Sequence, residues 1–245
     1  MPGLGLTISV TYIPSLGLNR MANFRKVPSD RVIHIGDTVA SVPRMTISSE
    51  IVSAHGLEVS AYFMDGGEGV SETILPGDCC VVVIYGELSL NGSVGGPGDA
   101  FYIPAGVPFS PWAQKPVKYV MALIPMDANT PAKEKTETIT NIDKSKHFKI
   151  WDIVDYIDGQ IANLSMVKND TLNLSAFAFG QGEKLKTHTA PGDALVIALE
   201  GEGLITIDGK PFTMKKGSAI VMPKDVPHSV EAVTPFKMLL IQVKK

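Results

Sequence analysis

The chain lacks the features that mark membrane proteins and nucleic-acid-binding proteins. It has no long basic stretch and a net charge of −3, which argues against a nucleic-acid groove and against a patch for anionic membranes. Prolines and glycines interrupt its first 20 residues, and no charge precedes Arg20. That segment therefore matches neither a signal peptide, which begins with positive charge, nor a membrane-spanning helix. We expect no nucleic-acid partner and no membrane partner.

Cysteine is nearly absent. Cys79 and Cys80 are adjacent, and adjacent cysteines form a disulfide only with poor geometry. Both begin the apolar, valine-rich run Cys79–Tyr85, which predicts a strand buried on both faces. We therefore expect buried, reduced thiols, which favours a cytoplasmic location.

Helical periodicity is scarce as well. Only Phe148, Trp151, Val154 and Ile157 fall at helical spacing, and they predict one short amphipathic helix on the outside of the second domain. The 23 glycines and 17 prolines instead favour many short strands and turns. The expected strands include Cys79–Tyr85, Phe101–Pro104, Tyr119–Ile124, Leu172–Phe179, Leu185–Thr189, Ala194–Leu199, Leu204–Ile207, Ala219–Met222 and Phe236–Val243. Asn91-Gly92 and Asp208-Gly209 are hairpin-turn pairs, so the pattern predicts an all-β sandwich or barrel.

One sequence pattern occurs twice. Residues 60–87 align without a gap with residues 175–202, and 10 of the 28 positions are identical. Residues 98–113 align with residues 217–232, with 7 of 16 identical. An internal repeat in a chain of 245 residues predicts two domains. We expect an extension outside the fold at 1–20, a first domain at 21–125, a polar linker at 126–146 and a second domain at 147–245.

The two copies differ where their chemistry would lie. Thr73 aligns with His188, and Phe109 aligns with His228. Residues shared by both copies are most simply structural, whereas the two histidines are unique to the second copy. The repeat therefore confines the candidate site to the second domain.

The second copy has a regular spacing of glycine, proline and histidine: Gly182 precedes His188 by five intervening residues, and Gly217, Pro223 and His228 follow in series. In this spacing the second copy resembles the two sequence motifs of the cupin superfamily. The resemblance extends to both halves and implies a bicupin. We therefore expect an all-β chain of two tandem cupin barrels, also described as double-stranded β-helices or jelly rolls, with a short helix near the linker.

The departures from the family pattern concern its metal ligands. The resemblance places the first and last ligand histidines at His188 and His228, but the second histidine falls on Ala190 and the glutamate on Ala194. In the first copy the four positions are Thr73, Leu75, Cys79 and Phe109. We therefore expect no metal in the first barrel. For the second barrel two alternatives stay open: one divalent ion (Zn, Ni, Mn or Fe) on His188 and His228, or a metal-free polar pocket in which they hydrogen-bond a ligand or water.

Asp193 lies one residue from the missing glutamate. Alternation along a strand would point it away from the interior. The first copy keeps Asp78 in the same Pro-Gly-Asp run without any histidine to support. We therefore interpret Asp193 as a turn residue that bonds local amides, and not as a metal ligand.

Two further residues join the candidate ligand site. Lys186 lies two residues before His188, so simple alternation would place both on one face and favour an anionic ligand. The alternative is a solvated lysine at the barrel rim. Met222 could offer a thioether to a soft ion or fill the core. His34, His55 and His147 lie outside any ligand spacing, and we expect them on the surface or in loops.

Three functions remain open from the sequence. The first is a small-molecule-binding bicupin, with a sugar or an organic acid as ligand. The second is a metal-dependent cupin enzyme of the isomerase, lyase or dioxygenase type, with a histidine as ligand or acid–base group. The third is a structural or interaction platform. A homodimer through edge strands is compatible with all three.

Overall fold

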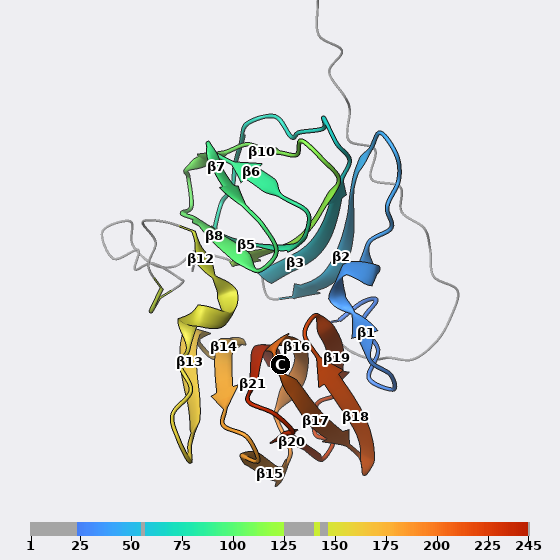
Figure 1. The fold of residues 1–245 in the computed structure, drawn as a ribbon, viewed down its shortest axis with the longest axis vertical. Coiled ribbons are helices and arrows are strands. Elements are labelled where there is room, and N and C mark those ends of the chain that lie inside the picture. Colours follow the sequence, from blue (N-terminus) through green and yellow to red (C-terminus); the bar gives the residue numbers. More distant parts are fainter. Residues whose placement is uncertain (1–23, 55–56, 125–139, 143–146, 245) are drawn as a thin grey trace, which may run out of the picture.

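The computed structural model describes residues 24–54, 57–124, 140–142 and 147–244. Apart from two 3₁₀ turns, every regular element in these residues is a strand, so the expected all-β class is confirmed. One barrel forms from each half of the chain, and the two are stacked (Figure 1). Among the described residues, no helix has the length and apolar character needed to cross a membrane. The predicted domain bounds stay predictions, since residues 1–20 and most of 126–146 lie outside the described residues, as does His55.

The amino-terminal barrel has one large sheet and two small ones. The large sheet has the order β12-β8-β5-β11-β3-β2, and the small ones are β10-β6-β7 and β4-β9. The strands are β2 (Thr46–Ala54), β3 (Leu57–Met64), β4 (Thr73–Ile74), β5 (Asp78–Tyr85), β6 (Leu88–Leu90), β7 (Ser93–Gly95), β8 (Asp99–Ile103), β9 (Pro108–Phe109), β10 (Pro111–Trp112), β11 (Val117–Ile124) and β12 (Phe148–Lys149).

The carboxy-terminal barrel pairs a large sheet with a four-stranded one. Their orders are β1-β19-β16-β21-β14-β13 and β15-β20-β17-β18. The strands are β1 (Ile33–His34), β13 (Ile161–Lys168), β14 (Leu172–Phe179), β15 (Lys184–His188), β16 (Gly192–Glu200), β17 (Glu202–Ile207), β18 (Lys210–Lys215), β19 (Ser218–Met222), β20 (His228–Ala232) and β21 (Phe236–Lys244). The expected strands of this half are all present, with ends shifted by at most two residues.

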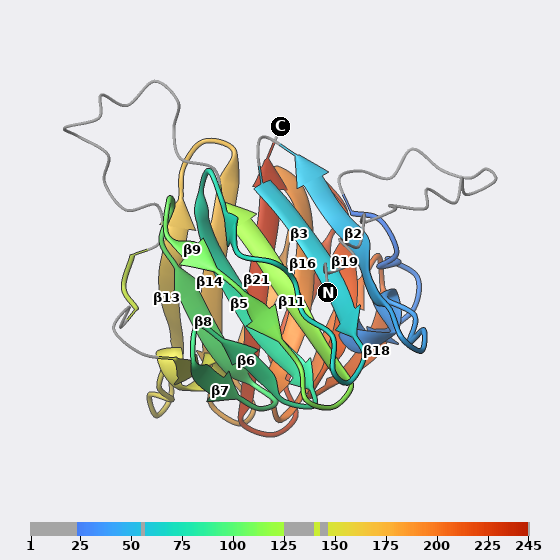
Figure 2. The ribbon, with the colours of Figure 1, turned by 90° about the horizontal axis from the view of Figure 1, so that it is seen from above.

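The two large sheets lie face to face, as the view in Figure 2 shows. Each is therefore covered on both sides, by its own barrel interior and by the other sheet. In β5, Cys79 and Val81 join the interior cluster of the amino-terminal barrel, while Cys80 and Val82 face the junction between the barrels. Both cysteines are free thiols, as predicted. Burial raises the pKa of the Cys80 thiol to about 12 and lifts that of Cys79 well above its ordinary value.

The hairpin turns form where expected. Asn91-Gly92 and Asp208-Gly209 have positive φ at both residues, which suits the turn type that joins two strands most tightly. Of the strands after residue 160, the sequence did not foresee β13, β18 and β20, because their polar residues interrupt the apolar alternation.

The predicted amphipathic helix is reduced to one short 3₁₀ turn, η2 (Ile150–Ile153), directly after β12. It does not lie on the outside of the second domain. Ile150 is buried in a cluster with Ala100 of one barrel and Leu199 of the other. The apolar spacing that suggested a helix therefore serves a segment that contacts both barrels.

Each barrel receives a short arm from the segment that precedes the other barrel. The first arm, β1 with the 3₁₀ turn η1 (Ile35–Thr38), pairs with β19, and the second arm, β12 with η2, pairs with β8. The arms lie on opposite sides of the junction in Figure 1, one blue and one yellow.

Equivalent backbone hydrogen bonds hold the two arms in place. Ile35 N–H donates to Gly217 O at 2.8 Å, and Ile150 N–H donates to Gly98 O at 2.9 Å. Gly98 and Gly217 are aligned in the repeat. The two halves are thus joined by an exchange that is nearly symmetric.

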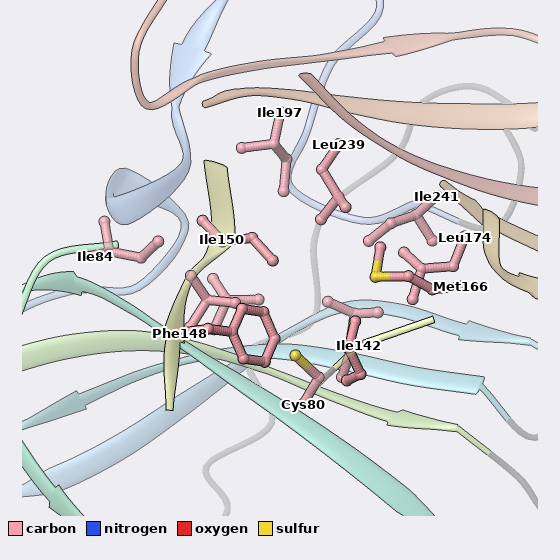
Figure 3. A pocket seen from close by; sticks show the side chains of 14 residues that line it. Cys80, Ile84, Ile142, Phe148, Ile150, Met166, Leu174, Ile197, Leu239 and Ile241 are labelled. Carbon is pink, nitrogen blue, oxygen red and sulfur yellow. The ribbon is translucent and has the colours of Figure 1, made fainter. Parts of the chain in front are cut away.

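An apolar cavity of about 50 Å³ lies between the barrels (Figure 3). Its walls come from both large sheets and from the second arm, which contributes Phe148 and Ile150. Among the described side chains that line it, the only heteroatoms are the sulfurs of Cys80 and Met166.

Candidate functional site

His188 and His228 are directly opposite each other on neighbouring strands. They are Cα partners in the β15–β20 pair, at the ends of both strands. Thr73 and Phe109 are Cα partners in the β4–β9 pair of the other barrel. The structure therefore places the two residue pairs at equivalent positions, as the alignment of the copies implied.

The two imidazoles touch and differ in exposure. Their ring centroids are 4.5 Å apart, and the planes meet at 63° in an edge-to-face contact. His228 is buried, with 2% of its surface exposed, whereas His188 is exposed. The pair thus runs from solvent toward the interior of the barrel.

Backbone carbonyls fix the orientation of both rings. His188 Nδ1 lies 2.9 Å from Lys186 O, and His228 Nδ1 lies 2.8 Å from Val226 O. A carbonyl oxygen only accepts, so each Nδ1 must carry the proton and donate it. In a neutral ring the lone pair is then on Nε2, which can accept a hydrogen bond or bind a metal ion.

The surroundings favour the neutral form of His228. Burial lowers the pKa of this imidazole below its ordinary value, and the neighbouring His188 lowers it further, against an opposing effect of the bond to Val226 O. A bare Nε2 on His228 is therefore the expected state at neutral pH. Such a nitrogen suits a hydroxyl donor or a cation, and it does not attract a carboxylate by itself.

The described residues bring no third metal ligand to the pair. No group of three or more His, Cys, Asp or Glu side chains within them could hold a metal ion. Ala194, at the family's glutamate position, is buried in the apolar cluster of the barrel interior. A divalent ion on the two Nε2 atoms would thus take its other ligands from water or from a bound molecule. The pair fits a weak two-imidazole site, and the full four-ligand set does not exist here.

Asp193 is engaged with a turn. Its Oδ1 accepts a hydrogen bond from Lys224 N–H at 2.8 Å. In the other barrel, Asp78 Oδ1 accepts from Ala105 N–H at 3.1 Å, and Lys224 and Ala105 are aligned positions. Both aspartates are buried. The same bond in both barrels supports the turn interpretation.

A bulge changes the face of Lys186. The register of β15 against β20 shifts between Leu185 and His188. Leu185 packs on the apolar cluster of the barrel interior, so alternation directs the exposed Lys186 outward. The bulge then returns His188 to the side of His228. Because a bulge leaves no mark in a single sequence, simple alternation does not determine the face of Lys186 relative to His188.

The remaining candidates lie at separate places. Met222 is buried in the interior cluster of the carboxy-terminal barrel, opposite Ala194. His34 is exposed in the first arm, where its Nδ1 accepts from Gly36 N–H and its ring lies against Gly217. His147 is exposed and contacts the Phe101 ring. The structure brings neither of these histidines into the site.

The interior of the amino-terminal barrel has its own polar atoms, which the sequence did not single out. Tyr62 and Tyr119 are direct partners on β3 and β11, and their rings stack with centroids 4.9 Å apart. Burial raises the pKa of Tyr62 to about 12 and shifts that of Tyr119 further upward. Both therefore stay protonated at neutral pH.

The comparisons with known proteins agree with this architecture. A family model described as "Cupin domain" matches residues 176–242. A cupin 2 conserved barrel domain protein from Leptotrichia buccalis is 29% identical, with a TM-score of 0.73, over 89% of this chain and 99% of that one. Salicylate 1,2-dioxygenase from Pseudaminobacter salicylatoxidans has a TM-score of 0.55 at 16% identity, over 76% of this chain and 71% of that one.

One curated relative has a named activity. The dimethylsulfoniopropionate lyase DddW of Ruegeria pomeroyi is 37% identical over 54 residues, which is 22% of this chain. The match spans 36% of the lyase, so the chain covers about a third of that relative's length.

Proposed function

Since the chain belongs to the cupin superfamily, as a two-domain member with a degenerate metal motif, we propose that its carboxy-terminal barrel binds a small hydroxyl-bearing molecule, such as a sugar or a hydroxy acid. The carrying observation is the facing pair of His188 and His228, whose Nδ1 atoms are both anchored on backbone carbonyls. Each ring is thereby held with Nε2 available. Met222 belongs to the apolar lining of the barrel, whereas the exposed Lys186 is directed outward and is given no contact with the ligand.

The acceptor character of the pair selects the ligand. A hydroxyl donates to a neutral Nε2, and two adjacent acceptors suit neighbouring hydroxyls of one molecule. An acid group would need a cation beside it, which a divalent ion on the two Nε2 atoms would supply. The equivalent position in the amino-terminal barrel is occupied by Thr73 and Phe109, which offer no such pair of acceptors.

The test is a ligand screen by thermal stabilisation. A ligand that binds only the folded chain raises the free energy of unfolding by RT ln(1 + [L]/Kd), which is about 2.7 kcal/mol at a hundredfold excess over Kd. We expect stabilisation by polyhydroxy compounds from a panel of sugars and organic acids. It should disappear in His188→Ala and in His228→Phe, and persist in the matched Thr73→Ala variant of the other barrel. Stabilisation that survives both histidine substitutions would refute the assignment.

A second candidate function is a metal-dependent cupin enzyme of the isomerase, lyase or dioxygenase type. The observation that favours it is the short match to a lyase, together with two Nε2 atoms oriented as in metal-binding histidines. Metal analysis of the purified protein separates the candidates. Stoichiometric Zn, Ni, Mn or Fe that is lost in the His188→Ala, His228→Ala double variant supports the enzyme. A metal-free protein that still binds a polyhydroxy compound supports the binding function.

A further inference from the structure

Exposed apolar side chains gather on the small sheets of the amino-terminal barrel. Ile74, Val94 and Trp112 are 63%, 58% and 45% exposed, and Val107 is 40% exposed. They come from β4, β7, β10 and the turn before β9. Large apolar side chains in such a group indicate an interaction surface more strongly than scattered ones do.

The strand register places the central members on one face. Val94 is opposite Ser89, and Ser89 is opposite Trp112. Directly opposite residues of paired strands share a face, so Val94 and Trp112 both point outward. The neighbours Leu88 and Leu90 are buried, as expected for the inner face. Trp112 also bridges to Gly69, where an added Cβ would lie 3.1 Å from the indole Cδ1.

The twin barrel shows that the fold does not require this apolar row. The equivalent row is Thr213, Leu204, Glu231 and Lys184, with the same pairwise register. Glu231 occupies the position equivalent to Trp112, and its carboxylate lies 2.8 Å from Lys184 Nζ. At these outward positions the carboxy-terminal barrel thus has the charged pair Glu231 and Lys184, whereas the amino-terminal barrel has Trp112 and Val94.

The free edge of the small sheet shows the same contrast. In the described residues, β7 ends the β10-β6-β7 sheet, and its three residues Ser93–Gly95 carry no charge. The equivalent edge strand β18 begins with Lys210 and ends with Lys215. Lysines on an edge strand oppose pairing with another chain, and β7 lacks them.

From these contrasts we propose that this face docks a second copy of the chain, face to face, through the row of Trp112 and Val94. In a two-fold dimer each patch meets its own copy, so any charge on it would oppose itself. The outward residues Ile74, Pro108, Ser110, Trp112 and Val94 carry no charge, which satisfies that condition. The histidine pair lies in the other barrel, so the dimer and the proposed ligand site stand independently.

Sedimentation velocity across micromolar concentrations tests the proposal. The wild type is expected to dimerise. Trp112→Glu and Val94→Lys introduce charge like that of the twin row, and each should raise the dimer dissociation constant at least about tenfold, which corresponds to about 1.4 kcal/mol. Ile157→Glu is the matched control, because Ile157 is 47% exposed but lies outside the row, and it should leave the dimer intact. A wild type that stays monomeric, or a dimer unaffected by Trp112→Glu, overturns the proposal.

A fluorescence measurement keeps the proposal testable if the charged variants fail to fold. The chain has two tryptophans, so Trp151→Phe leaves Trp112 as the sole reporter. Docking of a second copy would shield the indole, and acrylamide quenching should fall as protein concentration rises. Quenching that is independent of concentration would overturn the proposal.

Discussion

His228 and Phe109 occupy the same position in the two barrels, and their surroundings differ accordingly. Phe109 is buried in an apolar cluster with Leu75 and Val70 beside it. His228 is equally buried but has a carbonyl for Nδ1 and a second imidazole against its ring. A buried polar ring kept in only one of two related barrels points to a use for its free nitrogen.

The depressed pKa of His228 predicts a pH-dependent contribution to stability. Below the ordinary histidine value of about 6.5, the unfolded chain takes up a proton that the folded chain resists. The free energy of unfolding should therefore fall as pH drops from 7 toward the folded pKa. His228→Phe removes this component and should flatten the decline, as measured by urea unfolding at a series of pH values. An identical decline in both proteins would contradict the environment described for His228.

The two turn aspartates predict a pair of effects in the same range. Asp193→Ala and Asp78→Ala each leave a backbone amide without its carboxylate partner, at a cost of about 1–3 kcal/mol in the free energy of unfolding. Urea denaturation measures both. Metal content and ligand binding should be unchanged by Asp193→Ala. Loss of metal with the fold intact would show that Asp193 is a ligand after all.

The exchanged arms are the main feature at the level of elements. Each arm pairs with one barrel and is also held by a lysine of the other barrel, the one that follows it in the chain: Lys118 Nζ donates to Gly36 O at 2.8 Å, and Lys237 Nζ donates to Trp151 O at 2.8 Å. The two lysines are equivalent in the repeat, and so are the two carbonyls. The Trp151 ring lies against Gly98, and Lys216 Nζ is 3.8 Å from its centroid. The second arm thereby links both barrels.

Gly98→Ala tests the second arm. Gly98 has φ +84°, and an added Cβ would overlap the Trp151 ring. Gly92 has φ +82° but nothing within 4 Å of such a Cβ, so Gly92→Ala is the control that measures backbone strain without a steric overlap. We expect Gly92→Ala to cost about 1–2 kcal/mol and Gly98→Ala about 3 kcal/mol or more, by chemical denaturation. Equal costs would mean that the Trp151 contact contributes little.

Elements with strong local patterns were predictable, and those fixed by distant contacts were not. Leu172–Phe179 was predicted with the bounds of β14, because its alternation and flanking turns suffice. The helical spacing at Phe148 and Trp151 misled, since η2 is shaped by the two barrels around it. The bulge before His188 was likewise invisible, so the face of Lys186 could not be deduced.

On the scale of the whole molecule, the repeat predicted two barrels but not how they join. The large sheets bury their outer faces on each other, and the arms cross between them. Arm exchange pairs residues far apart in sequence, which a local pattern cannot indicate. The candidate site was easier to derive from the sequence, because comparing the two copies at each position singled out His188 and His228.

The cavity between the barrels predicts a stabilising substitution. Ala122 lines it from β11, a strand in which a β-branched residue is well tolerated. Ala122→Val should fill part of the space and raise the free energy of unfolding by about 0.5–1 kcal/mol. Urea or thermal denaturation provides the measurement. Destabilisation would mean that the two large sheets leave no room at this position.

The tautomers of the five histidines, measured by long-range proton–nitrogen NMR, test the central claim most directly. The proposed site requires that His188 and His228 both carry their proton on Nδ1 and leave Nε2 bare at neutral pH. On titration with Zn²⁺ as a probe of bare nitrogens, the Nε2 signals of these two rings should shift together and ahead of those of the other three. A proton on Nε2 of either ring, or Zn²⁺ shifts no larger than those of His34 and His147, would contradict it.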